Sequence, residues 1–257
     1  MDLDLPALIR RAQSRLLTMH FEAKVGHLGG NLSCLDALLV LHHGVLGPED
    51  VFVLSKGHSA GALYIALWSS GALSDEQLKQ FHRDNTKLSG HPAAGWHAGI
   101  RFATGSLGHG LGLAAGTALS RKLSGRPGRV FCLMSDGEWQ EGSAWESLVF
   151  IAHQKLNNLC VLIDANGLQG FGRVDAIASM GDLAPRLATF HVEVESLDGH
   201  DPAALAKALG AAQTGPKFLV LNTVKGHGVS FMQNRMEWHY LSLDEAQYRA
   251  ALKELGA

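Results

Sequence analysis

Apolar and polar residues follow two patterns along the chain. One is the three-to-four-residue spacing typical of helices, and the other is the continuous apolar run typical of buried strands. Between residues 5 and 24 the apolar positions recur three or four residues apart, which predicts an amphipathic helix. Residues 33–43 are apolar on most sides, which predicts a buried helix after a break at the sequence GHLGGNLS. Nearly continuous apolar runs predict strands that are buried on both faces. These runs are DVFVLS (50–55), RVFCLM (129–134), LCVLID (159–164) and KFLVLNTV (217–224).

The rest of the chain alternates between helical and extended patterns. Residues 57–71 predict a helix that ends at Gly71, and the segment Ser74–Phe81 begins with SDEQ, a capping box that starts another helix. Residues 84–106 show no clear periodicity, which predicts a long irregular loop with a functional role. The remaining patterns predict helices over 106–125, 140–156, 201–212 and the C-terminal residues, and a strand over 190–196.

Strands that alternate with helices predict an α/β fold in which a parallel sheet carries helices on both faces. The chain has 257 residues and shows no internal repeat or linker composition. We therefore expect a single domain over residues 1–257.

Composition and charge narrow the function classes. The formal net charge is −2, so the chain has no basic field that would recruit nucleic acid or an anionic membrane. The N-terminal residues contain no long apolar run, which argues against a secretory signal or a membrane span. Cys34, Cys132 and Cys160 are far apart in the sequence, which predicts buried, reduced thiols in a cytoplasmic protein.

Polar residues follow the predicted strands where the strands end. Asp136 follows RVFCLM, Asp164–Asn166 ends LCVLID, and Lys225–Gly228 follows KFLVLNTV. In open parallel sheets ligands bind at the carboxyl ends of strands, so these residues are expected along one edge. A buried, isolated carboxylate is costly, so Asp136 requires hydrogen bonds, a counter-charge or a metal ion.

A divalent cation is one interpretation of this edge. Asp136 and Asn166 supply oxygen ligands 30 residues apart (166 − 136 = 30), and Gly137 and Gly167 permit close backbone approach. Magnesium keeps few protein ligands and takes phosphate oxygens, so the site predicts a phosphorylated ligand. The alternative is that Asp136 caps the following helix and Asn166 lies in a turn.

A dinucleotide site is a weaker interpretation. The stretch GSLGHGLGLAAG (105–116) contains glycine spacings near GxGxxG. It follows a predicted loop rather than an apolar strand, and no acidic residue closes a second strand about 20 residues later.

The motifs in their order resemble the N-terminal, diphosphate-binding half of transketolase. They are GHLGGNLS, DVFVLSKGHSAGALY, LSGHP, ATGSLGHGLGLAAG, SDGEWQEGSAWES, LCVLIDANGLQG, VESLDGHD, TVKGHGV and EWH, and they cover nearly the full chain. The resemblance implies the thiamin diphosphate-binding fold, thiamin diphosphate with Mg²⁺ or Ca²⁺ as cofactors, and transfer of a two-carbon ketol unit from a ketose to an aldehyde acceptor.

The resemblance also implies residue roles. The metal ligands would be the side chains of Asp136 and Asn166 and the backbone carbonyl of Leu168. The same three residues would contact the cofactor, together with His58, Gly105, Ser106, Leu107, Gly137, Glu138, Lys225 and His239.

Further implied roles concern the reacting centre. His58 and His239 would line the diphosphate and the reacting centre, whereas His27 and His91 would bind sugar hydroxyls and shuttle protons. Glu141 would join an acidic network that links paired active sites.

Four further histidines receive no catalytic or binding role, and Ser135 departs from the family pattern. We expect His42 and His43 to be structural, and we assign no role to His200 or His227. Ser135 occupies a position where the family usually has glycine, so its hydroxymethyl group needs space beside the diphosphate or an unusual backbone angle must relax.

The second, pyrimidine-binding domain of the family has no counterpart in this chain. We therefore expect a split enzyme in which a separate C-terminal subunit completes each site, as a heterotetramer with two copies of each chain. Three alternatives stay open: a subunit of a 1-deoxyxylulose-5-phosphate synthase-like or 2-oxo acid enzyme, a specialised two-carbon transferase with an unusual acceptor, and a non-catalytic scaffold subunit.

Overall fold

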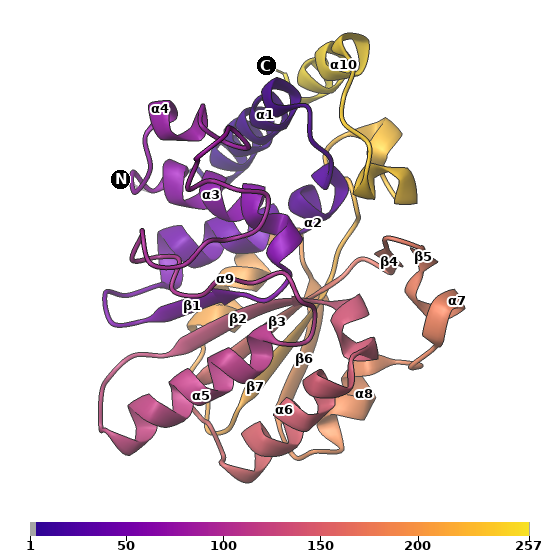
Figure 1. Ribbon diagram of the computed structural model, residues 1–257. Coiled ribbons are helices and arrows are strands. Elements are labelled where there is room, and N and C mark those ends of the chain that lie inside the picture. Colours follow the sequence, from indigo (N-terminus) through magenta and orange to yellow (C-terminus); the bar gives the residue numbers. More distant parts are fainter. Residues whose placement is uncertain (1–3, 257) are drawn as a thin grey trace.

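A five-stranded parallel sheet forms the centre of the computed structural model, which describes residues 4–256 (Figure 1). Its strands are β1 (Val51–Leu54), β2 (Val130–Ser135), β3 (Leu159–Ala165), β6 (Glu193–Asp198) and β7 (Lys217–Asn222). Their order is β1-β2-β3-β7-β6, and every neighbouring pair runs parallel. The predicted α/β fold with a parallel sheet is confirmed, and the prediction of one domain over 1–257 stays a prediction.

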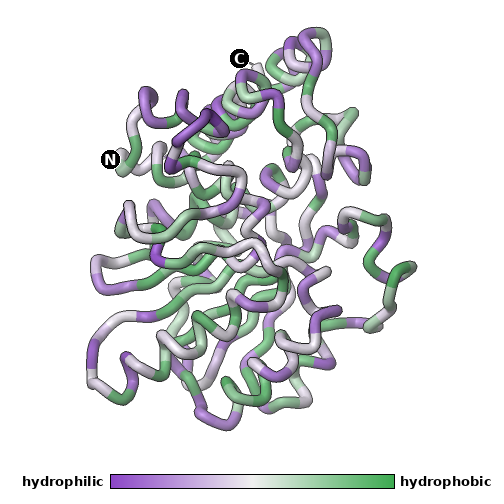
Figure 2. The backbone as a smooth tube through the Cα atoms, viewed as in Figure 1, coloured by the Kyte–Doolittle hydropathy of each residue, from purple (hydrophilic) through white to green (hydrophobic). Residues whose placement is uncertain are grey.

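Helices cover both faces of the sheet because successive strand residues point to opposite sides. In β2, Phe131 and Leu133 belong to one apolar core, whereas Cys132 and Met134 belong to the other. Figure 2 shows the strands as a largely hydrophobic layer between these helices. The core on the first face also contains residues of α1 (Leu5–Ala23), α2 (Leu28–Val40), α3 (Ala60–Ser69), α9 (Pro202–Gly210) and α10 (Glu245–Leu255), of which α10 packs on α1. The second face packs against α5 (Gly110–Leu123), α6 (Gly142–His153) and α8 (Leu183–Ala188).

Short elements connect this framework. The capping box predicted at Ser74 is present and starts α4 (Asp75–Leu78), and residues 84–106 are irregular apart from one bridge between His97 and Ile100. A small hairpin and helix that the sequence did not predict follow β3, namely β4 (Leu168–Gln169), β5 (Gly172–Arg173) and α7 (Val174–Ala178). A π-helix spans Leu41–Val45, and 3-10 turns span Gly57–Ser59, Asp136–Gln140, Ser230–Met232 and Met236–His239.

Some predicted boundaries differ from the observed ones. The helix break predicted at GHLGGNLS is present but confined to residues 24–27, because α1 ends at Ala23 and α2 already begins at Leu28. Gly29 is tolerated inside this helix because it permits close packing: a Cβ there would lie 2.9 Å from the Lys225 side chain. The strand predicted from residue 190 begins instead at Glu193, because His191 has a left-handed φ of 57°.

The three cysteines are buried and unpaired, in agreement with the expectation of buried thiols. Burial raises the pKa of the Cys34 thiol to about 11 and that of Cys160 to about 12. Among the helices of residues 4–256, none combines the length and the apolar character that a bilayer crossing requires.

Candidate functional site

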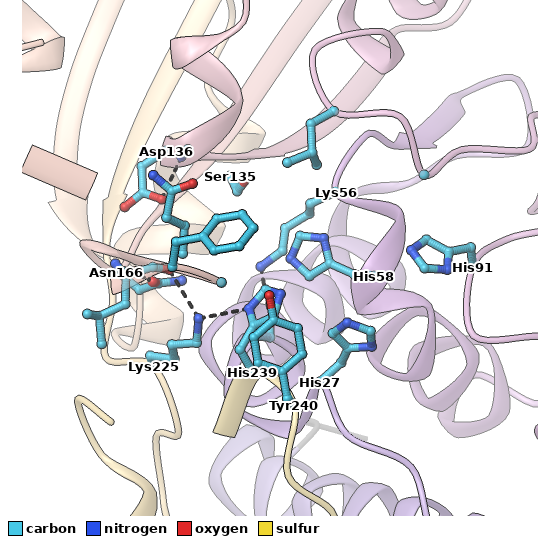
Figure 3. Close-up of a pocket in the computed structure, with 18 residues that line it drawn as sticks. His27, Lys56, His58, His91, Ser135, Asp136, Asn166, Lys225, His239 and Tyr240 are labelled. Atoms are coloured by element: carbon cyan, nitrogen blue, oxygen red, sulfur yellow. Dashed lines mark hydrogen bonds between the residues drawn. The ribbon is translucent and has the colours of Figure 1, made fainter. Parts of the chain in front are cut away.

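A pocket of about 220 Å³ opens at the carboxyl ends of the central strands. Figure 3 shows Asp136, Asn166 and Lys225 on one side of this pocket and His27, His58 and His91 on the other, with His239 between them next to Lys225. The lining residues are His27, Gly30, Lys56, His58, His91, Gly105, Leu107, Ser135, Asp136, Gly137, Asn166, Leu168, Gln169, Gly170, Phe171, Lys225, His239 and Tyr240. Most of the residues singled out from the sequence therefore meet at one place.

Asp136 directly follows β2 and is nearly buried. Its Oδ1 accepts a hydrogen bond from the Gly137 backbone N–H (2.8 Å), and its Oδ2 accepts one from the Gly167 N–H (2.6 Å). The following 3-10 turn is capped by Ser135, so Asp136 does not serve as the helix cap considered above. Burial, followed by the nearby Asp164 charge, raises the pKa of Asp136 to about 6.

Asn166 and Leu168 stand beside Asp136 on the same wall. Asn166 Nδ2 donates to Asp164 Oδ2 (3.2 Å), and Asn166 Oδ1 accepts from the Leu168 N–H (3.0 Å), which places Asn166 in a turn. The Leu168 carbonyl accepts from Lys225 Nζ (3.1 Å). Within residues 4–256, no side-chain cation lies within 4.0 Å of the Asp136 carboxylate. A buried carboxylate without a paired cation, beside further oxygen donors, fits a divalent metal ion.

The pocket also carries His27, His58, His91 and His239. The ring centroid of His27 lies 5.7 Å from that of His58, 6.0 Å from that of His91 and 5.1 Å from that of His239. His27 has a left-handed φ of 66°, which is uncommon outside glycine, and its N–H donates to the His239 carbonyl (3.1 Å). Backbone strain at this position is therefore held in place by the packing around the pocket.

All four of these imidazoles are neutral at neutral pH. Burial, followed by the His91 and Lys225 charges, lowers the pKa of His27 to about 4. Burial, followed by Lys225, lowers the pKa of His239 to about 3. The pKa of His58 lies well below its ordinary value through burial and Lys56, and burial also lowers the pKa of His91. A neutral imidazole offers one donor and one acceptor to a polar ligand.

Lys225 lies in the turn after β7 and reaches across the pocket floor. Its Nζ donates to the Leu168 carbonyl and lies 3.1 Å from His239 Nδ1. An ammonium group has no acceptor, so His239 Nδ1 is the unprotonated nitrogen of its ring. Burial, followed by the Lys56 charge, lowers the pKa of Lys225 to about 8.

Lys56 lines the pocket and was not recognised from the sequence. It is fully buried, donates to the Gly30 carbonyl (3.0 Å) and forms an ion pair with Asp164. Burial alone would raise the pKa of Asp164, but the Lys56 ammonium and its hydrogen bond hold that pKa below its usual range. The available signal was a single lysine at the end of the apolar run DVFVLS.

Three predicted site residues lie outside the pocket lining. Glu138 is fully buried behind the wall, where it accepts hydrogen bonds from the Ser55 hydroxyl, the Gly108 N–H (3.1 Å) and the Ser135 N–H (2.8 Å). Glu138 therefore ties the strand ends to the Gly105–Leu107 loop rather than facing the pocket. Ser106 and Glu141 are exposed on the protein surface.

Ser135 fits its position without an unusual backbone angle. Its φ and ψ are −97° and 161°, which is ordinary extended backbone. Its hydroxyl lies 3.3 Å from Glu138 Oε2. The hydroxymethyl group is therefore accommodated by the buried glutamate.

His200 and His227 lie away from the pocket, close to Asp36. Ligand atoms of these three residues lie within 4.8 Å of one another, as in a metal site. However, His200 Nε2 accepts a hydrogen bond from the Val224 N–H (2.9 Å), so His200 Nδ1 carries the ring proton and donates to Asp36 Oδ2 (2.7 Å). Both ring nitrogens of His200 are thus hydrogen-bonded, and the His200–Asp36 pair anchors the turn before Lys225.

His42 and His43 also lie outside the pocket, in the π-helix that follows α2. His43 Nε2 lies 2.9 Å from the Ser69 hydroxyl, and the His42 ring packs against Phe52. These contacts agree with a structural role.

Comparison with known proteins identifies relatives along nearly the whole chain. A subunit of the apulose-4-phosphate transketolase from Actinobacillus succinogenes is 35% identical over 241 residues, which covers 90% of this chain and 87% of the relative. The 6-deoxy-6-sulfo-D-fructose transketolase subunit SqwG from Clostridium sp. (strain MSTE9) is 35% identical over 243 residues, which covers 90% of this chain and 88% of the relative.

A solved structure extends the likeness to three dimensions. Transketolase from Campylobacter jejuni superposes with a TM-score of 0.90 at 28% identity. The match covers 100% of this chain but 43% of that transketolase, so the chain spans less than half of the solved protein. The family model for the transketolase thiamine diphosphate-binding domain matches residues 13–257. The chain therefore belongs to the transketolase family, in which it corresponds to the thiamine diphosphate-binding domain.

Proposed function

We propose that this chain is the thiamin diphosphate-binding subunit of a split transketolase, which transfers a two-carbon ketol unit from a ketose or ketose phosphate to an aldehyde acceptor. Similar proteins of nearly the same length are named as single subunits of transketolases, which supports a separate partner chain. In this proposal the partner is a C-terminal subunit that supplies the pyrimidine-binding domain, in a heterotetramer with two copies of each chain. We place the complex in the cytoplasm, in keeping with three unpaired thiols.

One observation carries the proposal. The oxygen atoms of Asp136, Asn166 and Leu168 line one wall of a pocket whose other wall consists of neutral histidines. The first wall has the chemistry of a hard-cation site, and the second has the chemistry of a site for sugar hydroxyls. Lys225, whose ammonium has no carboxylate partner within 4.0 Å among residues 4–256, favours an anionic ligand such as a diphosphate.

The side chains of Asp136 and Asn166 and the Leu168 carbonyl would hold Mg²⁺, or Ca²⁺ in its place, and water and phosphate oxygens would complete its coordination. Lys225 would release the Leu168 carbonyl to the metal and turn its ammonium toward the diphosphate. When bound, thiamin diphosphate supplies the electron sink that allows a carbon–carbon bond beside a carbonyl to break and form.

Backbone and histidine groups would fix this cofactor. Gly105 and Leu107 on one loop and Gly137 after β2 line the pocket and would let the backbone approach the cofactor. His58 and His239 would contact the diphosphate and the thiazolium end. Ser106 and Glu138 do not line the pocket. We assign Glu138 support of the loop and strand ends rather than direct contact, through the hydrogen bonds it accepts from the Gly108 and Ser135 N–H groups.

The remaining residues would serve the sugar and the second active site. His27 and His91 can each donate one hydrogen bond to a sugar hydroxyl and accept another, and they can pass a proton without carrying a charge. Glu141 directly precedes α6 and is exposed, which leaves its carboxylate available to a second copy of the chain.

Ligand binding tests this function directly. We expect thiamin diphosphate with MgCl₂ to raise the melting temperature of the complex of this chain with its partner, because a ligand that binds only the folded state stabilises it. Asp136→Ala should abolish the shift. Asp175→Ala is the matched control, because Asp175 is an exposed carboxylate outside the pocket lining, paired with Arg173. Wild-type complex that shows no shift would favour the scaffold alternative.

Substrate choice is tested separately. Two similar proteins are named for unusual ketose substrates, apulose-4-phosphate and 6-deoxy-6-sulfo-D-fructose, which favours a specialised transketolase over one of central sugar metabolism. Donor profiling of the complex should compare these ketoses with xylulose 5-phosphate and pyruvate, using several aldehyde acceptors. Release of a two-carbon unit from ketoses alone would support the proposal, whereas turnover of pyruvate alone would assign the chain to the 2-oxo acid type of thiamin enzyme.

A further inference from the structure

A fully buried carboxylate lies directly beneath the proposed metal site. Asp164 in β3 occupies the position two residues before Asn166 and is completely shielded from solvent. Its hydrogen-bond donors come from four different segments of the chain: Lys56 Nζ, the Ser33 hydroxyl (2.6 Å), the Thr223 hydroxyl and Asn166 Nδ2 (3.2 Å).

Stability alone is a weak reason for such an arrangement. Removing two charges from water is costly, and replacing a buried ion pair with well-packed apolar side chains of similar volume is often neutral or stabilising. Lys56 and Asp164 are both fully buried, so their pair bears this cost in full. A role in orienting a neighbouring group gives a better account of the pair.

The neighbouring group is the Asn166 amide, whose two ends have nearly the same shape but opposite hydrogen-bonding character. Asp164 Oδ2 can only accept a hydrogen bond while the carboxylate is charged, and Lys56 keeps it charged. The NH₂ end of Asn166 must therefore face Asp164, and it also points toward the Ser33 hydroxyl at 3.4 Å. The carbonyl end is left on the side of Leu168 and the pocket.

We propose that the Lys56–Asp164 ion pair is a positioning pair that holds the Asn166 carbonyl oxygen toward the bound metal. The inference rests on the proposed function, because it assumes that Asn166 is a metal ligand. A flipped amide would set its oxygen against the Asp164 carboxylate and its NH₂ group against the cation, which is unfavourable on both sides. Lys56 and Asp164 are thus not catalytic, and they act through Asn166.

The test measures metal affinity rather than activity. Mn²⁺ binding to the two-subunit complex, with saturating thiamin diphosphate, is followed by electron paramagnetic resonance. Asp164→Asn keeps the shape of the side chain but allows its own NH₂ group to face the Asn166 oxygen. We expect its Mn²⁺ affinity to fall roughly 10–100-fold, as is typical when a partner of a metal ligand is changed.

Asp164→Asn leaves the buried Lys56 ammonium unpaired, which could unfold the protein and lower its Mn²⁺ affinity for that reason alone. A second variant controls for this outcome. The double variant Lys56→Met/Asp164→Asn removes both charges, so we expect a melting temperature equal to or above that of the wild type without ligands. Its Mn²⁺ affinity should still fall at least tenfold. A purely structural pair would not show this split between stability and metal affinity.

Two further variants separate the possible failures. Thr223→Val is the matched control, because the Thr223 hydroxyl bonds the other Asp164 oxygen, and it should retain Mn²⁺ affinity within about twofold. Asn166→Ala reports whether Asn166 is a ligand at all, and unchanged affinity there would refute the proposed metal site itself. If Asn166→Ala loses affinity while the folded Lys56→Met/Asp164→Asn variant stays within about twofold of wild type, the positioning role is overturned and the proposed function stands.

Discussion

The buried charge of Asp136 should destabilise the ligand-free protein at neutral pH. The pKa of this carboxyl rises from an ordinary 3.8 to about 6, with burial as the main cause and Asp164 as the second. A difference of about two in pKa corresponds to ~3 kcal/mol. The folded chain holds the Asp136 proton more tightly than the unfolded chain, so the protonated carboxyl favours folding at low pH. This contribution is lost as pH rises toward and through about 6.

The substitution Asp136→Asn isolates this effect, because Asn cannot ionise. Relative to the variant, the wild type should lose ~2 kcal/mol of unfolding free energy between about pH 4.5 and about pH 7.5, the part of the ~3 kcal/mol that falls inside this window. An offset that does not vary with pH is also expected. Both Asp136 oxygens accept backbone N–H groups, and the Asn side chain can replace only one of these acceptors, which costs ~1 kcal/mol.

Urea unfolding of both proteins at matched pH, without thiamin diphosphate or metal, measures this difference directly. Ionisation of the other groups, including the histidines, is common to both proteins and cancels. The same variant should lose binding of Mg²⁺ with thiamin diphosphate. A stability difference that stays constant with pH would refute the account of Asp136 as a buried, uncompensated carboxylate. So would a wild type that gains stability relative to Asp136→Asn as pH rises.

Three further predictions follow from the packing and electrostatics around the pocket. Gly57→Ala places a Cβ 2.7 Å from the Thr104 carbonyl, so chemical denaturation should show an unfolding free energy about 1–3 kcal/mol lower than that of the wild type. An unchanged unfolding free energy would mean that the loop around Thr104 shifts at little cost. His200→Phe removes the acceptor of a backbone N–H and the donor to Asp36, so it should cost about 1–3 kcal/mol, and unaltered stability would contradict the anchoring role. Folded His27 and His239 have pKa values near 4 and 3, so their contribution to stability should be lost as pH falls from about 6.5 toward 4. Thermal melts of a His27→Gln/His239→Gln variant should show a shallower loss over that range than wild type, and equal slopes would argue against the lowered pKa values.

The sheet was predictable from sequence because its strands are buried on both faces and read as continuous apolar runs. The edge strand β6 was placed less accurately, since only Val194 and Leu197 among its residues are apolar and its preceding turn depends on His191. The hairpin of β4 and β5 was missed because two-residue strands leave no periodic pattern. The start of α2 was missed because the glycines that signal a break permit close packing against Lys225 instead.

The proposed metal ligands were found because Asp136 and Asn166 end consecutive buried strands, and consecutive parallel strands bring their carboxyl ends together. Lys56 was missed for the opposite reason. Its partner is Asp164, which lies 108 residues away in sequence, and only the assembly of β1, β2 and β3 side by side in the sheet brings the two together. Glu138 was placed in contact with the cofactor, whereas its burial behind the wall depends on the Ser55 hydroxyl and the Gly108 N–H from distant segments.

Burial is the main reason why four histidines can lie together near the proposed anion site without becoming charged. Lys56 and Lys225 both contribute to the lowered pKa values of His27, His58 and His239, in addition to burial. Because Lys56 is paired with Asp164, Lys225 supplies the positive charge that favours a diphosphate in the proposed function, and the imidazoles keep one donor and one acceptor each for a sugar. In the proposed function a bound diphosphate would offset the Lys225 charge and weaken its share of these shifts, whereas burial, the larger cause, would continue to hold the pKa values of His27 and His239 below 6.5. The imidazoles would therefore stay neutral beside the cofactor and act as hydrogen-bond donors and acceptors.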